Sequence, residues 1–261
     1  MLNVNMVHFR GVWGEANLAN ISIGNNVRNI MNGAFSFCNS LISIDLPESI
    51  VNIGDSAFNH CINLSHISIG NNVTSIGNNA FIYCSNLSTV SIGNGVTTIG
   101  NSAFCNCSAL SNITFIDNSH LSYIDWGAFM GCSNLVSLEL PRSVVTIAYN
   151  AFQKCSNLAN ITIPDNVTSL GDRAFLQCSN MTSAVIGSSV TSIDNYAFKD
   201  CHNLAQITVK NINPPTLGTD VFRGVASDCL IYVPNGYLSV YQTAWSEYAS
   251  MLRESAPVID V

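Results

Sequence analysis

Apolar and polar residues alternate in short stretches that recur along this chain. In residues 64–69, the sequence Leu-x-x-Ile-x-Ile places apolar side chains at alternate positions, which is the period of a short strand with one buried face. Gly-Asn-Asn at 70–72 predicts a turn, and Val-x-x-Ile at 73–76 predicts a second short extended segment. Gly77 is expected to turn the chain again by adopting a positive φ.

A block with the sequence Ala-Phe-x-x-Cys-x-x-Leu follows these two segments, and we expect it to form a single helical or 3₁₀ turn with its apolar residues inward. Copies of the block begin at Ala34, Ala57, Ala80, Ala103, Ala128, Ala151, Ala174 and Ala197. Successive copies are 23 residues apart, except for a spacing of 25 between Ala103 and Ala128. The two extra residues are assigned to a polar loop at 117–120. Because so short a unit cannot bury its own apolar side, the units must stack on one another.

Stacked units of this kind form a leucine-rich-repeat coil. We predict an α/β repeat solenoid, a right-handed leucine-rich-repeat coil of about ten 23-residue turns with a parallel sheet on one face and a C-terminal capping helix. Equivalent residues of neighbouring turns should lie about 4.8 Å apart, the spacing of adjacent strands. The Phe residues of the blocks should then stack in a column that fills the widest part of the coil.

The two ends of the chain differ from the repeats. Residues 1–17 are expected to form an N-terminal flank and a degenerate first turn, residues 18–229 the solenoid, and residues 230–261 a last strand and the capping helix. Apolar residues three and four apart in this last segment share one helical face, and they are Leu238, Tyr241, Trp245, Tyr248 and Leu252. Such a helix can cover the open end of the core; the alternative is an amphipathic helix that binds a partner.

Charged residues are scarce. Only 10% of the chain is Asp, Glu, Lys or Arg, against roughly 25% in a typical soluble domain, and none occurs from Ser56 to Ile116. The net charge of −7 argues against a nucleic-acid partner, which requires a basic surface. No apolar run approaches the roughly 20 residues that cross a bilayer. We therefore expect a neutral polar surface, no transmembrane segment and no nucleic acid.

Cysteine is the residue type that most invites a chemical role. Eight of the ten cysteines belong to the repeated blocks and are expected to be buried free thiols, because parallel inward side chains do not give the dihedral angle of a disulfide. Cys105 lies outside the column and next to Cys107. A zinc site there lacks further ligands, so the alternatives for Cys105 are a reactive, partly exposed thiol or an inert residue. We predict no bound metal and no cofactor.

The five histidines do not pair with a carboxylate or a serine at equivalent positions of the repeat. Catalysis needs a nucleophile, a base and an orienting group within hydrogen-bond reach. His66 occupies an outward strand position beside short polar residues, which favours surface decoration. The sequence therefore predicts no catalytic residues and no enzyme.

Residues 158–179 carry the motif Leu-x-x-Ile-x-Ile-Pro-x-x-Val-x-x-Leu-Gly-x-x-Ala-Phe-x-x-Cys almost as a consensus. This motif resembles the treponemal-type, BspA-like class of leucine-rich repeats, and the resemblance covers nearly the whole chain. Residues 213–216, 231–234 and 244–249 are similar to the closing segment of bacterial surface members of that class. The chain departs from the motif where Gly replaces Pro, at Gly24, Gly70, Gly93 and Gly187.

The resemblance implies a secreted or surface-anchored protein of host-associated bacteria, in a class linked to adhesion to host extracellular-matrix proteins and to other cells. Residues 1–20 lack the charged start and apolar core of a signal peptide. We expect that the signal has been trimmed and that the protein is secreted or displayed at the cell surface; the alternative is an intracellular protein.

The outward strand positions are the expected binding surface, because they should form one continuous sheet face lined with short hydroxyl and amide groups. The candidate partner-binding residues are Ser43, His66, Ser68, Thr89, Ser91, Asn112, Thr114, Ser137, Asn160 and Thr162. None is aromatic or Arg, the residue types that usually dominate binding energy, so binding should gain from length and multivalency. We predict a monomeric module for protein interaction or adhesion; the alternative is a structural spacer that displays neighbouring domains.

Overall fold

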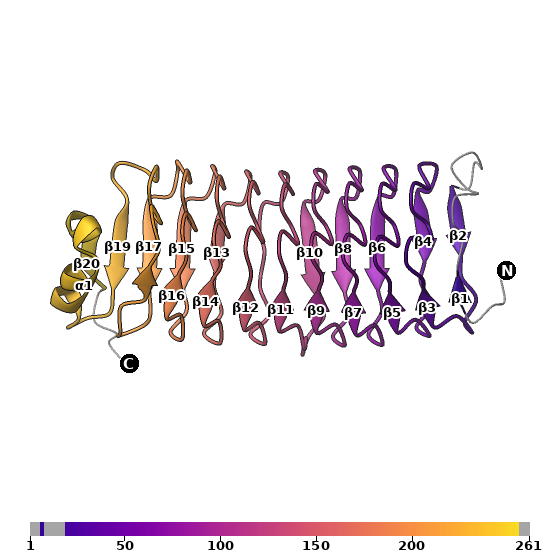
Figure 1. Cartoon of the computed structure of the whole chain (residues 1–261), viewed down its shortest axis with the longest axis horizontal. Coiled ribbons are helices and arrows are strands. Elements are labelled where there is room, and N and C mark those ends of the chain that lie inside the picture. The colour runs from indigo at the N-terminus through magenta and orange to yellow at the C-terminus, as the bar shows by residue number, and fades with distance from the viewer. Residues whose placement is uncertain (1–5, 8–18, 256–261) are drawn as a thin grey trace.

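The computed structural model describes residues 6–7 and 19–255. These residues form an elongated solenoid of parallel strands, seen side-on in Figure 1. Equivalent strands are 23 residues apart in most turns, as in the pairing of Thr89 with Asn112 and of Ser75 with Thr98. The predicted repeat solenoid of about ten turns is confirmed.

The first strand of each turn contributes to one side of the solenoid, which we call the strand face. Its strands are β2 (Asn20–Ser22), β4 (Ser43–Asp45), β6 (His66–Ile69), β8 (Thr89–Ile92), β10 (Asn112–Phe115), β13 (Asn160–Thr162), β15 (Ser183–Ile186), β17 (Gln206–Val209) and β19 (Leu230–Val233). In β6, exposed and buried residues alternate in the predicted order. The Leu-x-x-Ile-x-Ile pattern therefore forms half-buried strands as expected.

The second extended segment of each turn forms a separate, ten-stranded parallel sheet. Its members are β1 (Met6–Val7), β3 (Asn29–Ile30), β5 (Asn52–Ile53), β7 (Ser75–Ile76), β9 (Thr98–Ile99), β11 (Tyr123–Ile124), β12 (Thr146–Ile147), β14 (Ser169–Leu170), β16 (Ser192–Ile193) and β18 (Thr216–Leu217). The order β1-β3-β5-β7-β9-β11-β12-β14-β16-β18 has no interruption. It passes through the turn with two extra residues, where Tyr123 pairs with Thr98 on one side and Thr146 on the other.

The Ala-Phe blocks form the third side, which we call the turn face. The expected helical or 3₁₀ turn is wrong, because these residues form successive tight turns, with left-handed φ values of 55° at Asn79 and 61° at Tyr83. Backbone hydrogen bonds link the blocks directly, as from Phe58 N–H to the Ala80 carbonyl at 2.7 Å. Phe rings of successive blocks stack with centroids 5.0 to 5.4 Å apart from Phe35 to Phe198. The predicted Phe column is confirmed.

Gly77 has a different role from the one predicted. The left-handed residue of this turn is Asn79, and Gly77 itself does not have a positive φ. A Cβ at Gly77 would lie 2.5 Å from the carbonyl carbon of Gly54 in the preceding turn. Glycine is therefore required here by the close approach of two backbones.

The C-terminal segment covers the last turn, but its helix is shorter than predicted. The α-helix α1 spans Leu238–Ala244, a 3₁₀ helix spans Ser246–Met251, and Leu252 begins strand β20 (Leu252–Glu254), which pairs with β19. The Tyr241 hydroxyl donates to the Asn211 carbonyl at 2.6 Å and the Trp245 indole to the Pro215 carbonyl at 2.8 Å. Both side chains are buried, so the segment closes the core at this end. Most of the predicted N-terminal flank, 1–17, lies outside the described residues.

Candidate interaction surface

The predicted partner-binding residues lie on the outside of the strand face. Nine of them are in strands, namely Ser43 in β4, His66 and Ser68 in β6, Thr89 and Ser91 in β8, Asn112 and Thr114 in β10, and Asn160 and Thr162 in β13. All ten are exposed or half-buried. Neighbouring strands align them in rows, such as Ser68, Ser91 and Thr114. The structure therefore brings short polar side chains together at the spacing of adjacent strands.

Ser137 is the exception, because residues 137–140 form no strand. The sheet of the strand face is divided into a two-stranded part (β2-β4), a three-stranded part (β10-β8-β6) and a five-stranded part (β13-β15-β17-β19-β20). The prediction of one continuous sheet across the strand face is therefore wrong. The wider interruption surrounds residues 137–140, which follow the turn with two extra residues.

Proline accounts for the wider interruption of the strand-face sheet, around residues 137–140. At the turn after the strand, Gly93 N–H donates to the Ile69 carbonyl at 2.8 Å and Ile116 N–H donates to the Ile92 carbonyl at 3.0 Å. Pro47, Pro141 and Pro164 occupy the equivalent positions. Since proline has no backbone N–H, this bond between turns cannot form at these three positions. The wider break lies at Pro141 and Pro164, on either side of residues 137–140, whereas β2 and β4 stay paired across Pro47 and the break between β4 and β6 lies at Gly70.

Two grooves flank residues 137–140. Groove 1 has a volume of about 820 Å³ and is lined by residues 112–119 on one side and 137–143 on the other, with Asn160. Groove 2 has a volume of about 680 Å³ and lies between residues 138–142 and 160–166, with Lys210. The interrupted sheet thus leaves two hollows in the surface that contains several of the predicted residues.

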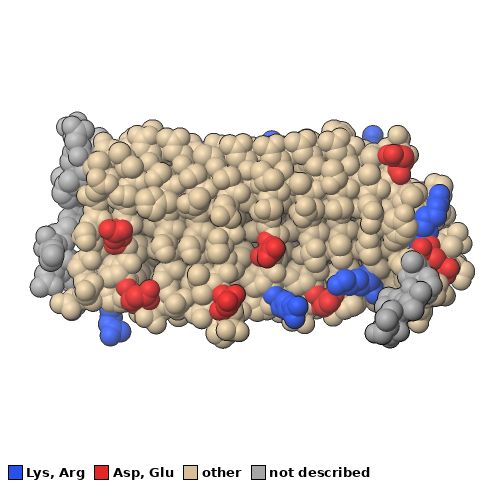
Figure 2. All heavy atoms as spheres, turned by 180° about the vertical axis from the view of Figure 1, so that it is seen from behind, with Lys and Arg blue, Asp and Glu red and all other residues tan. Residues whose placement is uncertain are grey.

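Charged side chains line both grooves. Figure 2, which shows the side of the molecule opposite to that in Figure 1, shows that most of this surface is neither acidic nor basic. Groove 1 is lined by Asp117, Glu139 and Arg142. Across groove 2, Lys210 Nζ lies 3.4 Å from Asp165 Oδ1. The Ser188 backbone N–H, and then Lys210, lower the pKa of Asp165.

The eight cysteines of the Ala-Phe blocks form a column of buried thiols without disulfide bonds. All ten cysteines are unpaired thiols with little exposure, which agrees with the prediction for the eight in the column. Seven of these thiols donate to a Phe carbonyl of the preceding block, as from Cys107 Sγ to Phe81 at 3.1 Å. The slot therefore requires a small residue that can also donate a hydrogen bond, which the sequence did not reveal.

Cys105 is buried as well, at 2% exposure, which contradicts the alternative of a partly exposed reactive thiol. Burial raises the pKa of the Cys105 thiol to about 11, so its thiolate is scarce near neutral pH. Within residues 6–7 and 19–255, no group of three or more His, Cys, Asp or Glu side chains could hold a metal ion. In the same part of the chain, no helix has the length and apolar character to cross a membrane.

The turn face carries aromatic and basic residues that the sequence reading missed. Trp126 stacks at a tilt on Tyr149, with centroids 6.0 Å apart. The Arg173 guanidinium lies 5.4 Å from the Tyr149 ring centroid and 5.1 Å from that of Tyr196. Reading the two positions before each Ala-Phe block as columns would have found this row.

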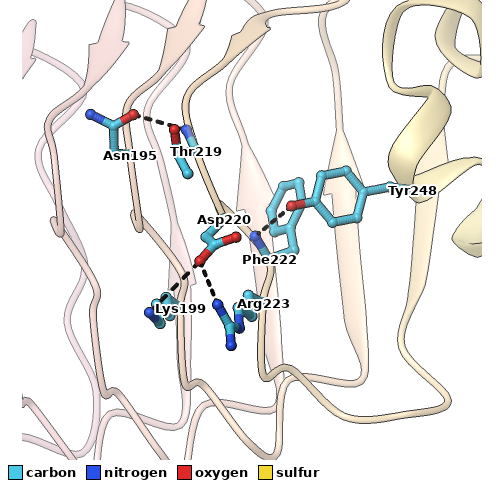
Figure 3. Close-up of polar contacts among 7 residues, drawn as sticks. All are labelled: Asn195, Lys199, Thr219, Asp220, Phe222, Arg223 and Tyr248. Carbon is cyan, nitrogen blue, oxygen red and sulfur yellow. Dashed lines mark hydrogen bonds and ion pairs between the residues drawn. The ribbon is translucent and has the colours of Figure 1, made fainter.

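The row ends beside the C-terminal segment, as Figure 3 shows. Asp220 lies between two cations, with Lys199 Nζ at 3.8 Å and Arg223 Nη1 at 3.0 Å. The Phe222 N–H donates to the Tyr248 hydroxyl at 3.5 Å. Both cations are thus paired with the same carboxylate, and the bond from Phe222 to Tyr248 connects the last turn to the 3₁₀ helix that covers it.

A family model described as the BspA type leucine-rich repeat region matches residues 10–122 and 115–227 of this chain, in six copies. This chain belongs to the BspA-type leucine-rich-repeat family. The family suggests a role in protein–protein interaction or at a surface, and leucine-rich-repeat folds are typically non-enzymatic. A search of curated protein sequences finds no match.

Several solved structures are similar to this chain. A leucine-rich repeat protein from Bacteroides ovatus is 28% identical, with a TM-score of 0.75 over 95% of this chain and 63% of that one. This chain therefore spans less than two thirds of that protein's length. The leucine-rich repeat protein of T. pallidum is 24% identical, with a TM-score of 0.57 over 69% of this chain and 83% of that one. The pneumococcal vaccine antigen PcpA, at 18% identity and a TM-score of 0.51 over 96% and 90%, shares the fold.

Proposed function

We propose that this BspA-type chain is a non-enzymatic, surface-displayed or secreted module that binds other proteins through its strand face, with host extracellular-matrix proteins as the partner class. The observation that carries the proposal is the set of aligned rows of short, neutral, outward side chains, such as Ser68, Ser91 and Thr114. Hydroxyl and amide groups donate and accept hydrogen bonds, and ordering them costs little side-chain entropy. Rows repeated along a rigid axis provide many equivalent contacts, so weak individual contacts add up.

Two observations support the partner class, namely family membership and the neutrality of the middle of the strand face. A row without charge from Ser68 to Thr114 does not repel an acidic or a neutral partner. The absence of a basic surface disfavours nucleic acid as the partner. We further propose that the chain acts as a monomer, because the C-terminal segment already covers the core at one end.

The test is binding of the whole chain to immobilised, purified matrix proteins, comparing wild type with two double variants. Thr89→Arg with Asn112→Arg places two cations on neighbouring strands of the strand face. Val145→Arg with Thr168→Arg places two cations at exposed positions of neighbouring turns beside the ten-stranded sheet. The two variants are matched in charge and in spacing. Exposed substitutions of this kind usually change stability by less than about 0.5 kcal/mol.

We expect the strand-face variant to lose binding and the matched variant to keep it. Retention of binding by the strand-face variant with loss in the matched variant would place the partner on the other sheet. If wild type binds no matrix protein, adhesion is rejected and the structural spacer becomes the better reading.

A further inference from the structure

One edge of β10 faces groove 1 with unused backbone groups. Asn112 N–H donates to the Ser88 carbonyl at 3.3 Å and Ile116 N–H to the Ile92 carbonyl at 3.0 Å, both toward β8. Along a strand, successive residues direct their backbone groups to opposite sides. The N–H and C=O groups of Ile113 and Phe115 therefore point away from β8 and toward residues 137–140. Among the described residues, no strand pairs with this edge of β10.

Pro141 keeps this edge open. It stands at the turn position whose N–H would donate to the Phe115 carbonyl, by analogy with Ile116 and Ile92. Proline cannot make that bond. The inward residues beside groove 1 are also less completely covered than elsewhere, since Ile113 is 6% exposed and Leu138 5%, against 2% for Val90 in β8. An edge with unpaired N–H and C=O groups is a template for another strand.

The shape of groove 1 suits an extended chain. One wall runs along eight consecutive residues, 112–119, and the other along residues 137–143. A strand rises about 3.3 Å per residue, so the four residues of β10 can pair with an extended segment of similar length. Three of the predicted partner-binding residues line the groove and are exposed to solvent, namely Asn112, Thr114 and Ser137.

The charges around groove 1 select what such a segment carries. Groove 1 is lined by two carboxylates, Asp117 and Glu139, and by one guanidinium, that of Arg142. Within the described residues, none of these three side chains belongs to an ion pair. Glu139 and Arg142 also line groove 2, where the other two charges, Lys210 and Asp165, pair with each other. The unpaired excess of acid in groove 1 favours a basic side chain on the occupant.

We infer that groove 1 receives an extended segment of a partner polypeptide that carries a Lys or Arg residue, and that this segment adds as a strand to the free edge of β10. Backbone hydrogen bonds to Ile113 and Phe115 hold it, as in other cases of strand addition, and Asp117 and Glu139 select the basic residue. The inference rests on the proposed function, because it states how a protein partner engages the strand face.

The experiment measures amide hydrogen exchange of the full chain by NMR, with and without three synthetic hexapeptides at millimolar concentration. The first has the sequence Val-Ser-Val-Thr-Val-Lys with blocked ends, the second has Glu in place of Lys, and the third is the Lys peptide with alternate backbone nitrogens methylated. Without peptide, the Ile113 and Phe115 amides should exchange at least about tenfold faster than those of Val90 and Ile92, which face a paired edge. The Lys peptide should slow Ile113 and Phe115 by about fivefold per hydrogen bond formed. The Glu peptide should slow them less, and the methylated peptide should leave them unchanged.

Two variants test the role of the proline. Pro141→Gly supplies the backbone N–H that can donate to the Phe115 carbonyl. This variant should slow amide exchange at the free edge of β10 and should abolish the slowing of exchange by the Lys peptide. Pro47→Gly makes the same change at the equivalent turn position away from groove 1 and should leave the response intact. Slow exchange of Ile113 and Phe115 in the free wild-type protein, or no response to the Lys peptide, would overturn strand addition.

The outcomes separate this inference from the proposed function. A wild-type chain that binds matrix proteins but does not respond to the Lys peptide keeps its function and loses strand addition. A chain that responds to the peptide as expected but binds no matrix protein keeps the strand-addition site and loses the matrix partner.

Discussion

The strand face and the ten-stranded sheet are built from the same repeats, yet only the ten-stranded sheet is continuous. After each strand of the ten-stranded sheet from β5 to β18, a residue with a backbone N–H donates to the preceding turn, as Gly77 does to Ile53 at 2.9 Å and Ala148 to Ile124 at 3.0 Å. At the corresponding turn of the strand face, three positions are proline. The missing donor at Pro141 and Pro164 accompanies the wider interruption of the strand face. A proline at this position removes one bond between turns but does not always separate the strands, since β2 and β4 stay paired across Pro47.

The two extra residues at 117–120 affect the ten-stranded sheet and the strand face differently. They belong to the loop between β10 and β11, where His120 N–H donates to the Asn94 carbonyl at 3.0 Å and ties the longer loop to the turn before it. The ten-stranded sheet resumes in register at Tyr123. The strand face does not resume until β13, because the next strand-face segment ends at Pro141.

The largest expected effect acts on the core that the two sides share. Burial raises the pKa of Cys38 and Cys105 to about 11 and that of Cys155 to about 12, from an ordinary value of 9.0. Above pH 9 the unfolded chain loses these protons while the folded chain keeps them, so stability is full below pH 9 and falls as pH rises toward 11. The loss is about 1.4 kcal/mol per pH unit for each such thiol. Urea unfolding at pH 8 to 11 should show a steep fall in the midpoint, and an unchanged midpoint would contradict it.

Removing one ring of the Phe column should have the next largest effect. Phe129 is fully buried and stacks on Phe104 and Phe152 at 5.3 and 5.4 Å. Phe129→Ala should cost about 3 to 5 kcal/mol by urea unfolding, because it leaves a cavity in a packed core. Amide exchange should quicken on both sheets around this turn. A response confined to one sheet would show that the two sides do not share this core.

A matched pair of proline substitutions tests the comparison directly. Ala148→Pro removes a donor from the continuous ten-stranded sheet and should cost about 3 kcal/mol. Ile116→Pro removes a donor from the strand face, where Pro47, Pro141 and Pro164 already occupy the equivalent position, and should cost about 1 kcal/mol. Urea unfolding of both variants checks the order. Equal costs would mean that the strand face has no special tolerance for proline.

The smallest expected effect concerns the ion pair across groove 2. Lys210 and Asp165 are both largely exposed to solvent. Lys210→Gln should therefore change the free energy of unfolding by less than about 1 kcal/mol, since exposed ion pairs contribute little. Thermal unfolding at low and at high salt measures it. A larger loss that salt abolishes would show that this ion pair holds the interrupted part of the strand face together.

Prediction from sequence was accurate wherever a residue type recurred with the repeat. The eight block cysteines and the Phe column were predicted because each copy of the repeat has the same residue at the same position. The shape of the surface that contains the ten candidate residues was predicted less well. The ten outward residues were located correctly, but the grooves were not foreseen, because they arise from bonds that do not form between turns.

The sequence by itself determined the repeat, its two short strands, the inward residues and the two extra residues at 117–120. These are local properties, since the alternation of apolar and polar residues decides which side chains must leave water. Only the tertiary structure decided that Gly77 is required by a close approach of backbones, that Cys105 is buried and that the strand face is interrupted beside Pro141. Each of these depends on how near the next turn lies, because backbone contact and hydrogen bonding between turns depend on positions in space that one repeat does not specify.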